Sequence, residues 1–310
     1  MRANSYQADS VLRTTDQLSD EELLAWLKLA RVYVGRAPEA IKLIAAFELP
    51  EAVFEAPRAL VRKVTGEENA RRLFSQDTEL EAQSALTWLR RTPTADVVLV
   101  TDADYPQELI ATESPEVLFF CRGRRDVLRF PRLTVLVTAK ADSEGRRNLQ
   151  DFCRTLSNQG IVCVMPVENE VDKMGVLATL EAGGGGLILS ASGPDRVTNP
   201  SCLDVWQVTE QQGLILTAEF PGQGATDSTR KRREFFLAAL SRGVLVIETE
   251  RRGTALDVAR RAAELGRDVA ALPGSIHSPL YKGNHLLIRQ GAKLTESLED
   301  LVKDFGLDSD

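Results

Sequence analysis

Two dipeptides whose atoms could bind phosphate follow apolar runs of this chain. Gly253 and Thr254 come after the apolar run 244–247, and Ser192 and Gly193 come after the run 186–190. Backbone N–H groups and hydroxyls at a helix N-terminus, just beyond the carboxyl end of a strand, are donors suited to an anion. Glycines are also common at such turns for steric reasons alone. The two dipeptides therefore indicate an anion site only in combination with other features.

Basic residues gather near the same turns. They are Lys140, Arg146, Arg147, Arg196, the run 230–233 (Arg-Lys-Arg-Arg) and Lys282. A helix is predicted over residues 229–241, so the run would stand at a helix N-terminus, where cations oppose the helix dipole. Two interpretations of the run stay open: a solvated helix start, or cations placed there for an anionic partner.

Catalytic, cofactor and metal chemistry find little support. The turn after the first strand of the α/β region reads Val-Thr-Ala-Lys-Ala over residues 137–141, without a glycine-rich dinucleotide fingerprint, and no P-loop occurs. The two histidines, His277 and His285, have no evident nucleophile or acid beside them in the pattern. Glu248, at the end of a strand, is expected to cap a helix or pair with an arginine. We therefore expect no enzyme activity, no metal and no cofactor.

Composition sets limits on partners and compartment. The net charge of −7 argues against unspecific attraction to nucleic acid, although a local basic groove is still compatible with it. The apolar runs are too short for a membrane span, and the first residues lack a signal-peptide core. Four cysteines without paired spacing favour free thiols in the cytoplasm.

The chain is expected to form a polar, poorly ordered arm (1–18), a small all-α domain (19–92) and an α/β domain (96–310). Ser19 and Glu22 form a capping-box pattern that opens the helical part. We interpret this domain as a packing and protein-interaction module, because Gly35 stands alone where a helix-hairpin-helix turn would need two glycines.

Strands and helices alternate regularly after Pro131. Strands are predicted at 133–138, 161–165, 186–190, 214–218, 244–247 and 269–272, and helices at 144–157, 171–182, 203–212, 229–241 and 254–265. Continuous apolar strands separated by helices indicate a doubly wound, mostly parallel Rossmann-like sheet. Two further strands, at 97–100 and 117–120, precede it. Ligands of such a sheet bind beyond the carboxyl ends of its strands.

The order of short motifs resembles the DNA-processing protein A family (DprA, also called Smf) over nearly the whole chain. The motifs are Tyr105-Pro106, residues 115–118 with Arg122-Gly123, residues 192–196, residues 213–216 with 219–221, and residues 240–248. The run continues with Gly253-Thr254, Gly266-Arg267, Pro273 to Ile276, Gly283-Asn284, Leu287-Ile288 and Gly291-Ala292. A sterile-alpha-motif-like helical domain in front also fits the family.

The resemblance implies a non-catalytic, dimeric protein that binds single-stranded DNA and loads a RecA-type recombinase during DNA uptake. It implies a basic pocket at the strand ends that grips the phosphate backbone. The residues assigned to it are Lys140, Arg146, Ser192, Gly193, Arg196, Arg230, Lys231, Arg233, Gly253, Thr254, Gly274, Lys282 and Asn284. Family members often continue into a winged-helix-like domain, and we expect none within these 310 residues.

The pocket motifs depart from the family pattern. Thr138-Ala139-Lys140 stands where the family has glycine, serine or threonine, and arginine. In the turn over residues 165–172 only Asp172 survives, and Glu168 adds negative charge; on the basic run Glu234 replaces an asparagine. Each misplaced charge would cost on the order of 1–3 kcal/mol at a phosphate site. We therefore expect a degenerate pocket with weakened DNA binding.

Three functions stay open on this basis. The first is a DprA-like single-stranded DNA-binding recombination mediator. The second is a divergent paralogue that has lost DNA binding and acts through contacts with another protein. The third is a Rossmann-like phosphoribohydrolase, although of the glycine-rich motif of that class residues 248–257 supply only Gly253-Thr254.

Overall fold

The computed structural model describes residues 15–306, which separate into two compact units. The first unit contains the N-terminal helices and reaches to Cys121, together with residues 218–223; the second contains the rest. The boundaries predicted from the sequence, 19–92 and 96–310, stay predictions.

The first unit consists mainly of short helices. These are α1 (Asp20–Val32), α2 (Ala37–Phe47), α3 (Ala52–Glu55), α4 (Arg58–Thr65), α5 (Glu67–Leu73), α6 (Gln76–Arg91) and α7 (Gln107–Ile110), with strands β1 (Ala95–Leu99) and β2 (Leu118–Gly123). The Ser19 hydroxyl caps α1 by accepting a hydrogen bond from the Glu22 N–H, as predicted. The arm predicted over residues 1–18 lies mostly outside the described residues. Its last part, Thr15–Gln17, forms the 3-10 turn η1, and Leu18 is buried, which differs from the prediction.

The second unit is built on parallel strands. They are β3 (Arg132–Val137), β4 (Val162–Met165), β5 (Gly186–Leu189), β6 (Leu214–Thr217), β7 (Gly243–Glu248), β8 (Asp268–Ala271) and β9 (Lys293–Leu294), in the order β6-β5-β4-β3-β7-β8-β9. Every adjacent pair in this order is parallel. The order reverses between β3 and β7, which makes the carboxyl ends of these strands and of β4 the expected place for a ligand.

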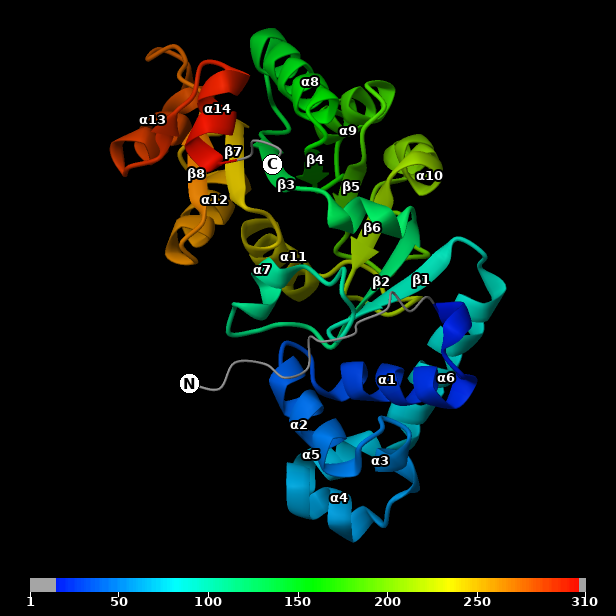
Figure 1. The fold of residues 1–310 in the computed structure, drawn as a ribbon. Coiled ribbons are helices and arrows are strands. Elements are labelled where there is room, and N and C mark those ends of the chain that lie inside the picture. The colour runs from blue at the N-terminus through cyan, green and yellow to red at the C-terminus, as the bar shows by residue number, and fades with distance from the viewer. Residues whose placement is uncertain (1–14, 307–310) are drawn as a thin grey trace. The chain divides into compact units, whose positions relative to one another are not determined.

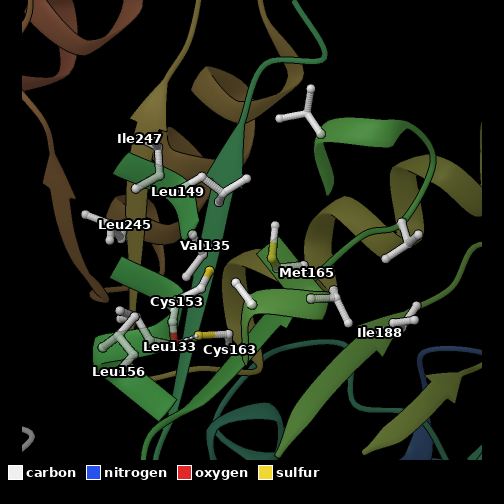
Figure 2. Packing of buried hydrophobic residues seen from close by; sticks show 14 of the residues in the cluster. Leu133, Val135, Leu149, Cys153, Leu156, Cys163, Met165, Ile188, Leu245 and Ile247 are labelled. Carbon is white, nitrogen blue, oxygen red and sulfur yellow. Dashed lines mark hydrogen bonds between the residues drawn. The ribbon is translucent and has the colours of Figure 1, made fainter. Parts of the chain in front are cut away.

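Helices cover both faces of these strands, as a doubly wound fold requires. On one side lie α8 (Ser143–Asn158), α9 (Glu170–Glu181), α10 (Leu203–Gln212) and α14 (Leu298–Phe305), and on the other lie α11 (Asp227–Ala239) and α12 (Thr254–Glu264) (Figure 1). Figure 2 shows how the first layer packs: Leu149 and Cys153 of α8 meet Val135 of β3 and Met165 of β4. The predicted fold class is thus confirmed.

The predicted elements of the α/β region match the observed ones within a few residues. The prediction did not include the helices α7, α13 (Lys282–Arg289) and α14 or the two-residue strand β9. These pieces are short, and their apolar residues follow no long period. Among the described residues, no helix has the combined length and apolarity that a bilayer crossing needs.

Gly213 lies where two backbones approach too closely for a side chain. It follows α10, and a Cβ atom added to it would stand 2.3 Å from the carbonyl oxygen of Gly186 on β5. That oxygen belongs to backbone and cannot rotate away. The start of β6 therefore requires glycine at this position.

We expect Gly213→Ala to lower the free energy of unfolding by about 2 kcal/mol or more, because the clash forces the β5 and β6 backbones apart. Urea unfolding followed by circular dichroism measures this. Gly224→Ala is the matched control, since a Cβ there meets nothing within 4 Å. Equal stability of the two variants would contradict the close approach.

Candidate functional site

A cleft of about 370 Å³ opens at the carboxyl ends of the central strands of the second unit. Three turns and two helices line it: Thr138 and Ala139 after β3, residues 166–172 after β4, residues 249–253 after β7, α11, and the start of α12. The topology dictates this meeting, because parallel neighbours end at one edge of the sheet. The turns after β3, β4 and β7 therefore face one cleft at the strand ends.

The dominant contact in the cleft is an ion pair between α11 and the turn after β4. Arg233, only 5% exposed, places Nη1 2.8 Å from Glu168 Oε1, and Arg230 places Nε 3.3 Å from the same oxygen. One carboxylate thus neutralises two arginines that were predicted to hold phosphate. The guanidinium Nε of Arg233 is buried and has no hydrogen-bond partner among the described residues.

Asp172 and Asn169 complete the acidic side of the cleft. The Asp172 carboxylate accepts hydrogen bonds from the Glu168 N–H and the Asn169 side-chain amide, which hold the turn in place. Burial raises the pKa of Asp172 to about 7, although these hydrogen bonds and the charge of Arg233 oppose the shift. Asn169 also caps α9 by accepting from the N–H groups of Val171 and Asp172. The free N–H groups at the start of α9 therefore already have an acceptor in the Asn169 side chain.

The N-terminus of α12, on the opposite wall, has no such cap. Gly253 is the N-cap residue and supplies no side-chain hydrogen bond, so Gly253, Thr254 and Ala255 line the cleft with the open start of a helix. Arg252 beside them is exposed and has no ion pair in the described part of the chain. This wall favours an anion.

Lys140 stands near this wall and is partly neutralised. Its Nζ lies 3.5 Å from the carboxylate of Glu250, and the Lys140 side chain is 79% exposed. Burial alone would raise the pKa of Glu250, but hydrogen bonds from its own backbone and from Thr138, together with Lys140, lower it. Glu250 is therefore a permanent negative charge beside the lysine that was predicted to bind phosphate.

The charges that line the cleft nearly cancel. Its arginines are Arg230, Arg233 and Arg252, and its acids are Glu168, Asp172, Glu234 and Glu250. Asn169, Glu250 and Arg252 were not among the residues predicted for the site. Their position in turns after apolar strands was the available signal, but only the fold shows that they share one cavity.

Comparison with known proteins gives the family. The model of DNA recombination-mediator protein A matches residues 96–306. This chain belongs to that family. Membership in this family confirms two expectations from the sequence: the chain is a DNA-processing protein of the mediator type, and it is not an enzyme.

Several relatives support the same assignment. DNA processing protein DprA of Streptococcus pneumoniae is 31% identical over 206 residues, which cover 66% of this chain and 73% of the relative. Protein Smf of Escherichia coli is 30% identical over 228 residues, covering 73% of this chain and 61% of the relative.

Two solved structures agree in fold. The crystal structure of the S. pneumoniae DprA superposes with a TM-score of 0.76 at 25% identity, covering 93% of this chain and 98% of that one. A structure of DNA processing protein A from Helicobacter pylori, whose single-stranded DNA binding mode it describes, has a TM-score of 0.63 at 18% identity, covering 71% and 99%. The second likeness shows the fold alone.

Several residues assigned to the DprA-type pocket lie elsewhere in the second unit. Ser192 is buried, and its hydroxyl donates to the Arg196 carbonyl at 2.6 Å, which closes a turn that also uses the Gly193 carbonyl. Arg196 is exposed, and Arg146 donates to the Ala141 carbonyl at 2.9 Å. These contacts hold local turns, and none of these residues lines the cleft.

The basic run on α11 is divided by the helix. Arg230 and Arg233 face the cleft, whereas Lys231 is exposed and does not line it. The helix begins at Asp227 with Thr226 as its cap, so the run starts after the first turn. The expectation that these cations oppose the helix dipole at its N-terminus was therefore wrong. The capping box at Thr226 starts the helix at Asp227, earlier in the chain than the predicted start at residue 229.

Asn284 of α13 is fully buried and ties together the ends of β7 and β8. Its Oδ1 accepts from the Thr249 N–H at 2.8 Å, and its Nδ2 donates to the carbonyls of Val246, Ile247 and Leu272. Gly274 packs against the Tyr281 ring, and the Lys282 ammonium donates to the Ile276 carbonyl. These three predicted residues lie outside the cleft lining, in the segment that closes the sheet edge.

Glu248, at the end of β7, has an unexpected environment. It is 0% exposed, and no arginine forms an ion pair with it among the described residues. The predicted arginine-pairing role was therefore wrong. A hydrogen bond with the backbone of Asp142, the N-cap residue of α8, opposes the effect of burial on its pKa. Burial, with the negative charge of Asp142 nearby, raises its pKa to about 7.

Metal and histidine chemistry gain nothing from the fold. Within residues 15–306, no group of three or more histidine, cysteine, aspartate or glutamate side chains could hold a metal ion. His285 lies 3.0 Å from the Gly274 carbonyl through Nε2, which is a structural contact.

Asn284→Ala should lower the free energy of unfolding by about 2–4 kcal/mol, because it removes the side-chain partner of the buried Thr249 N–H and of the carbonyls of Ile247 and Leu272. Chemical unfolding measures the loss. Asn158→Ala, at the exposed end of α8, should change stability by less than about 0.5 kcal/mol. A neutral Asn284→Ala would show that Asn284 does not tie the strand ends together.

Glu248 should make stability fall as pH rises. Its pKa is near 4.5 in the unfolded chain and about 7 in the folded one, so the folded state binds the extra proton between these values. The stabilising contribution of this proton is complete below pH 4.5 and is lost above pH 7. The free energy of unfolding of Glu248→Gln minus that of wild type should therefore rise by about 1–3 kcal/mol from low to high pH. Unfolding curves across this range test it, with the exposed Glu296→Gln as control; parallel pH profiles of wild type and Glu248→Gln would refute it.

Proposed function

We propose that this chain is a single-stranded DNA-binding recombination mediator whose strand-end cleft binds DNA weakly. The observation that carries the proposal is the double ion pair of Glu168 with Arg233 and Arg230. The carboxylate occupies the position against these arginines that a DNA phosphate would need. The names of the family, DNA recombination-mediator protein A, and of the S. pneumoniae relative, DNA processing protein DprA, support DNA as the ligand class. The H. pylori structure describes single-stranded DNA binding by a protein of the same fold.

Competition with Glu168 accounts for the weakness. A phosphate entering the cleft must separate Glu168 from Arg233 and leave a partly buried carboxylate beside a second negative charge. Breaking one partner of a buried ion pair costs more than the pair contributed, because the remaining charge is uncompensated. Glu234 and Glu250 add repulsion from two further sides.

Binding would rely on the wall formed by α12. Its uncapped N-terminus at Gly253 and Thr254, with the unpaired Arg252, is the part of the cleft that attracts anions. Lys140 extends this wall and exchanges Glu250 for phosphate at little cost, since exposed ion pairs are weak. The proposed DNA contacts are therefore Gly253, Thr254, Arg252, Lys140, Arg230 and Arg233.

The proposal includes loading of a RecA-type recombinase and action as a homodimer in the cytoplasm. A groove lined by apolar residues, among them the exposed Ile276 and Leu294, and by basic residues such as Arg251 and Arg289 would suit a second copy of the chain. Four buried free thiols fit a reducing compartment. The near-cancelling charges of the cleft favour one alternative: a paralogue without DNA binding that acts through protein contacts.

Glu168→Gln tests the proposal directly. It removes the competing charge while keeping the shape, so we expect affinity for labelled oligo-dT at low salt to rise roughly tenfold, equivalent to about 1.4 kcal/mol. Arg252→Ala should lower affinity several-fold and reduce the salt slope by about 0.7. Fluorescence anisotropy at several salt concentrations measures both.

Glu170→Gln is the matched control, since Glu170 is a neighbouring carboxylate that does not line the cleft. Equal affinity of wild type and Glu168→Gln would refute internal competition. Absence of binding at low salt in every variant would favour the alternative that acts through protein contacts.

A further inference from the structure

A second concentration of positive charge belongs to the helical unit, whereas the strand-end cleft belongs to the other unit. Over residues 57–75 the chain carries five cations, Arg58, Arg62, Lys63, Arg71 and Arg72, against two carboxylates, Glu67 and Glu68. The whole chain has a net charge of −7. Helices α4 and α5, which carry these residues, are adjacent in sequence and pack against each other (Figure 1).

Between these helices runs a groove of about 500 Å³. Arg58 and Arg62 line it from α4. The other wall, from α5 to the start of α6, supplies Arg71, Phe74 and Ser75 and one carboxylate, Glu67. A further hollow of about 360 Å³ shares Arg71 and Ser75 with it and adds Arg31 and Arg72, together with the carboxylates Glu68, Asp77 and Glu81. The two hollows therefore form one surface, which we call the arginine groove.

Arg58, Arg62 and Arg71 of this groove are exposed, whereas Arg31 pairs with Glu81. Arg58 has no ion pair among the described residues. Arg62 pairs with Glu67 at 3.4 Å and Arg71 with Glu68 at 2.9 Å, but all four side chains are more than half exposed. Exposed ion pairs contribute little and exchange readily for another anion. By contrast, Arg233 in the cleft is 5% exposed and paired.

The groove also has an aromatic and apolar floor. The Arg58 guanidinium lies over the Phe74 ring, 4.9 Å from its centroid, and Phe54 meets Phe74 edge to face at 5.8 Å. Ala59 and Ala70 complete the floor. An aromatic ring surrounded by guanidinium groups suits a DNA strand: a base stacks in the groove while the backbone phosphates beside it contact the arginines.

We propose that the arginine groove is a second binding surface for single-stranded DNA, which rests on the function proposed above. An acidic peptide is the competing partner. Nucleic acid fits better for two reasons: the cations that line the groove are arginines, whose planar donors match phosphate in pairs, and an aromatic ring lies among them. The helical unit thus supplies exposed cations, whereas Arg230 and Arg233 of the cleft are neutralised by Glu168.

The test uses the full chain and labelled oligo-dT, with the double variant Arg58→Gln, Arg71→Gln. We expect affinity to fall about tenfold at moderate salt. The slope of log affinity against log salt should fall by about 1.4, because each lost phosphate contact on a single strand removes about 0.7. The matched control is Lys42→Gln, Arg91→Gln, which removes two exposed cations of the same unit that do not line the groove. Its affinity should change less than twofold.

A second double variant, Arg58→Lys, Arg71→Lys, keeps the charge and serves if the glutamine variant unfolds. It should keep the salt slope and lose affinity a few-fold, since lysine lacks the planar pair of donors. Unchanged affinity in this variant overturns the groove as an arginine-specific site.

The outcomes separate this proposal from the previous one. If the glutamine variant behaves like its control while Glu168→Gln still raises binding, the groove is overturned and the cleft stands. If the glutamine variant loses binding while Glu168→Gln and Arg252→Ala change nothing, the groove is supported and the cleft is overturned. Absence of DNA binding by wild type overturns both. Displacement of oligo-dT by a poly-glutamate of equal charge, at equal concentration, overturns the groove as a DNA site.

Discussion

The ion pair of Glu168 with Arg233 and Arg230 determines what the strand-end cleft can do. It joins the turn after β4 to α11 across the point where the sheet order reverses. Because Arg233 is buried, its charge requires a counterion within the fold, and Glu168 supplies it. The same pair that stabilises the wall of the cleft also reduces its attraction for an outside anion. Stability and ligand binding therefore compete for one carboxylate.

The walls of the cleft differ in a way that follows from their caps. Asn169 satisfies the start of α9 with its own side chain, and Asp172 reinforces that turn, so this wall has little left to offer a ligand. Gly253 leaves the start of α12 without a side-chain cap. The DprA-like motif around Gly253 and Thr254 thus faces a wall whose polar groups are bonded to one another. This explains why the sequence matches the family pattern on one side of the cleft and departs from it on the other.

Much of the family resemblance outside the cleft reflects folding requirements. Asn284 ties strand ends together, Gly213 permits a close backbone approach, and Gly274 makes room for Tyr281. These residues keep the scaffold of the recombination-mediator family at 25% identity to the S. pneumoniae structure. A residue shared with a family motif is therefore a guide to fold first. Its charge and exposure decide whether it can contact a ligand.

The sequence by itself determined the doubly wound α/β fold and the approximate positions of its main strands. Periodic burial of apolar residues and short-range caps, such as Ser19 before α1, are local signals that need no partner. Only the tertiary structure decided that Glu168 meets Arg233 and that Asn284 and Glu248 are buried. Ion pairs, burial and pKa values depend on which distant segments meet, and the spacing of residues along the chain does not encode the distance between their side chains. The charge balance of the cleft is therefore a property of the folded chain.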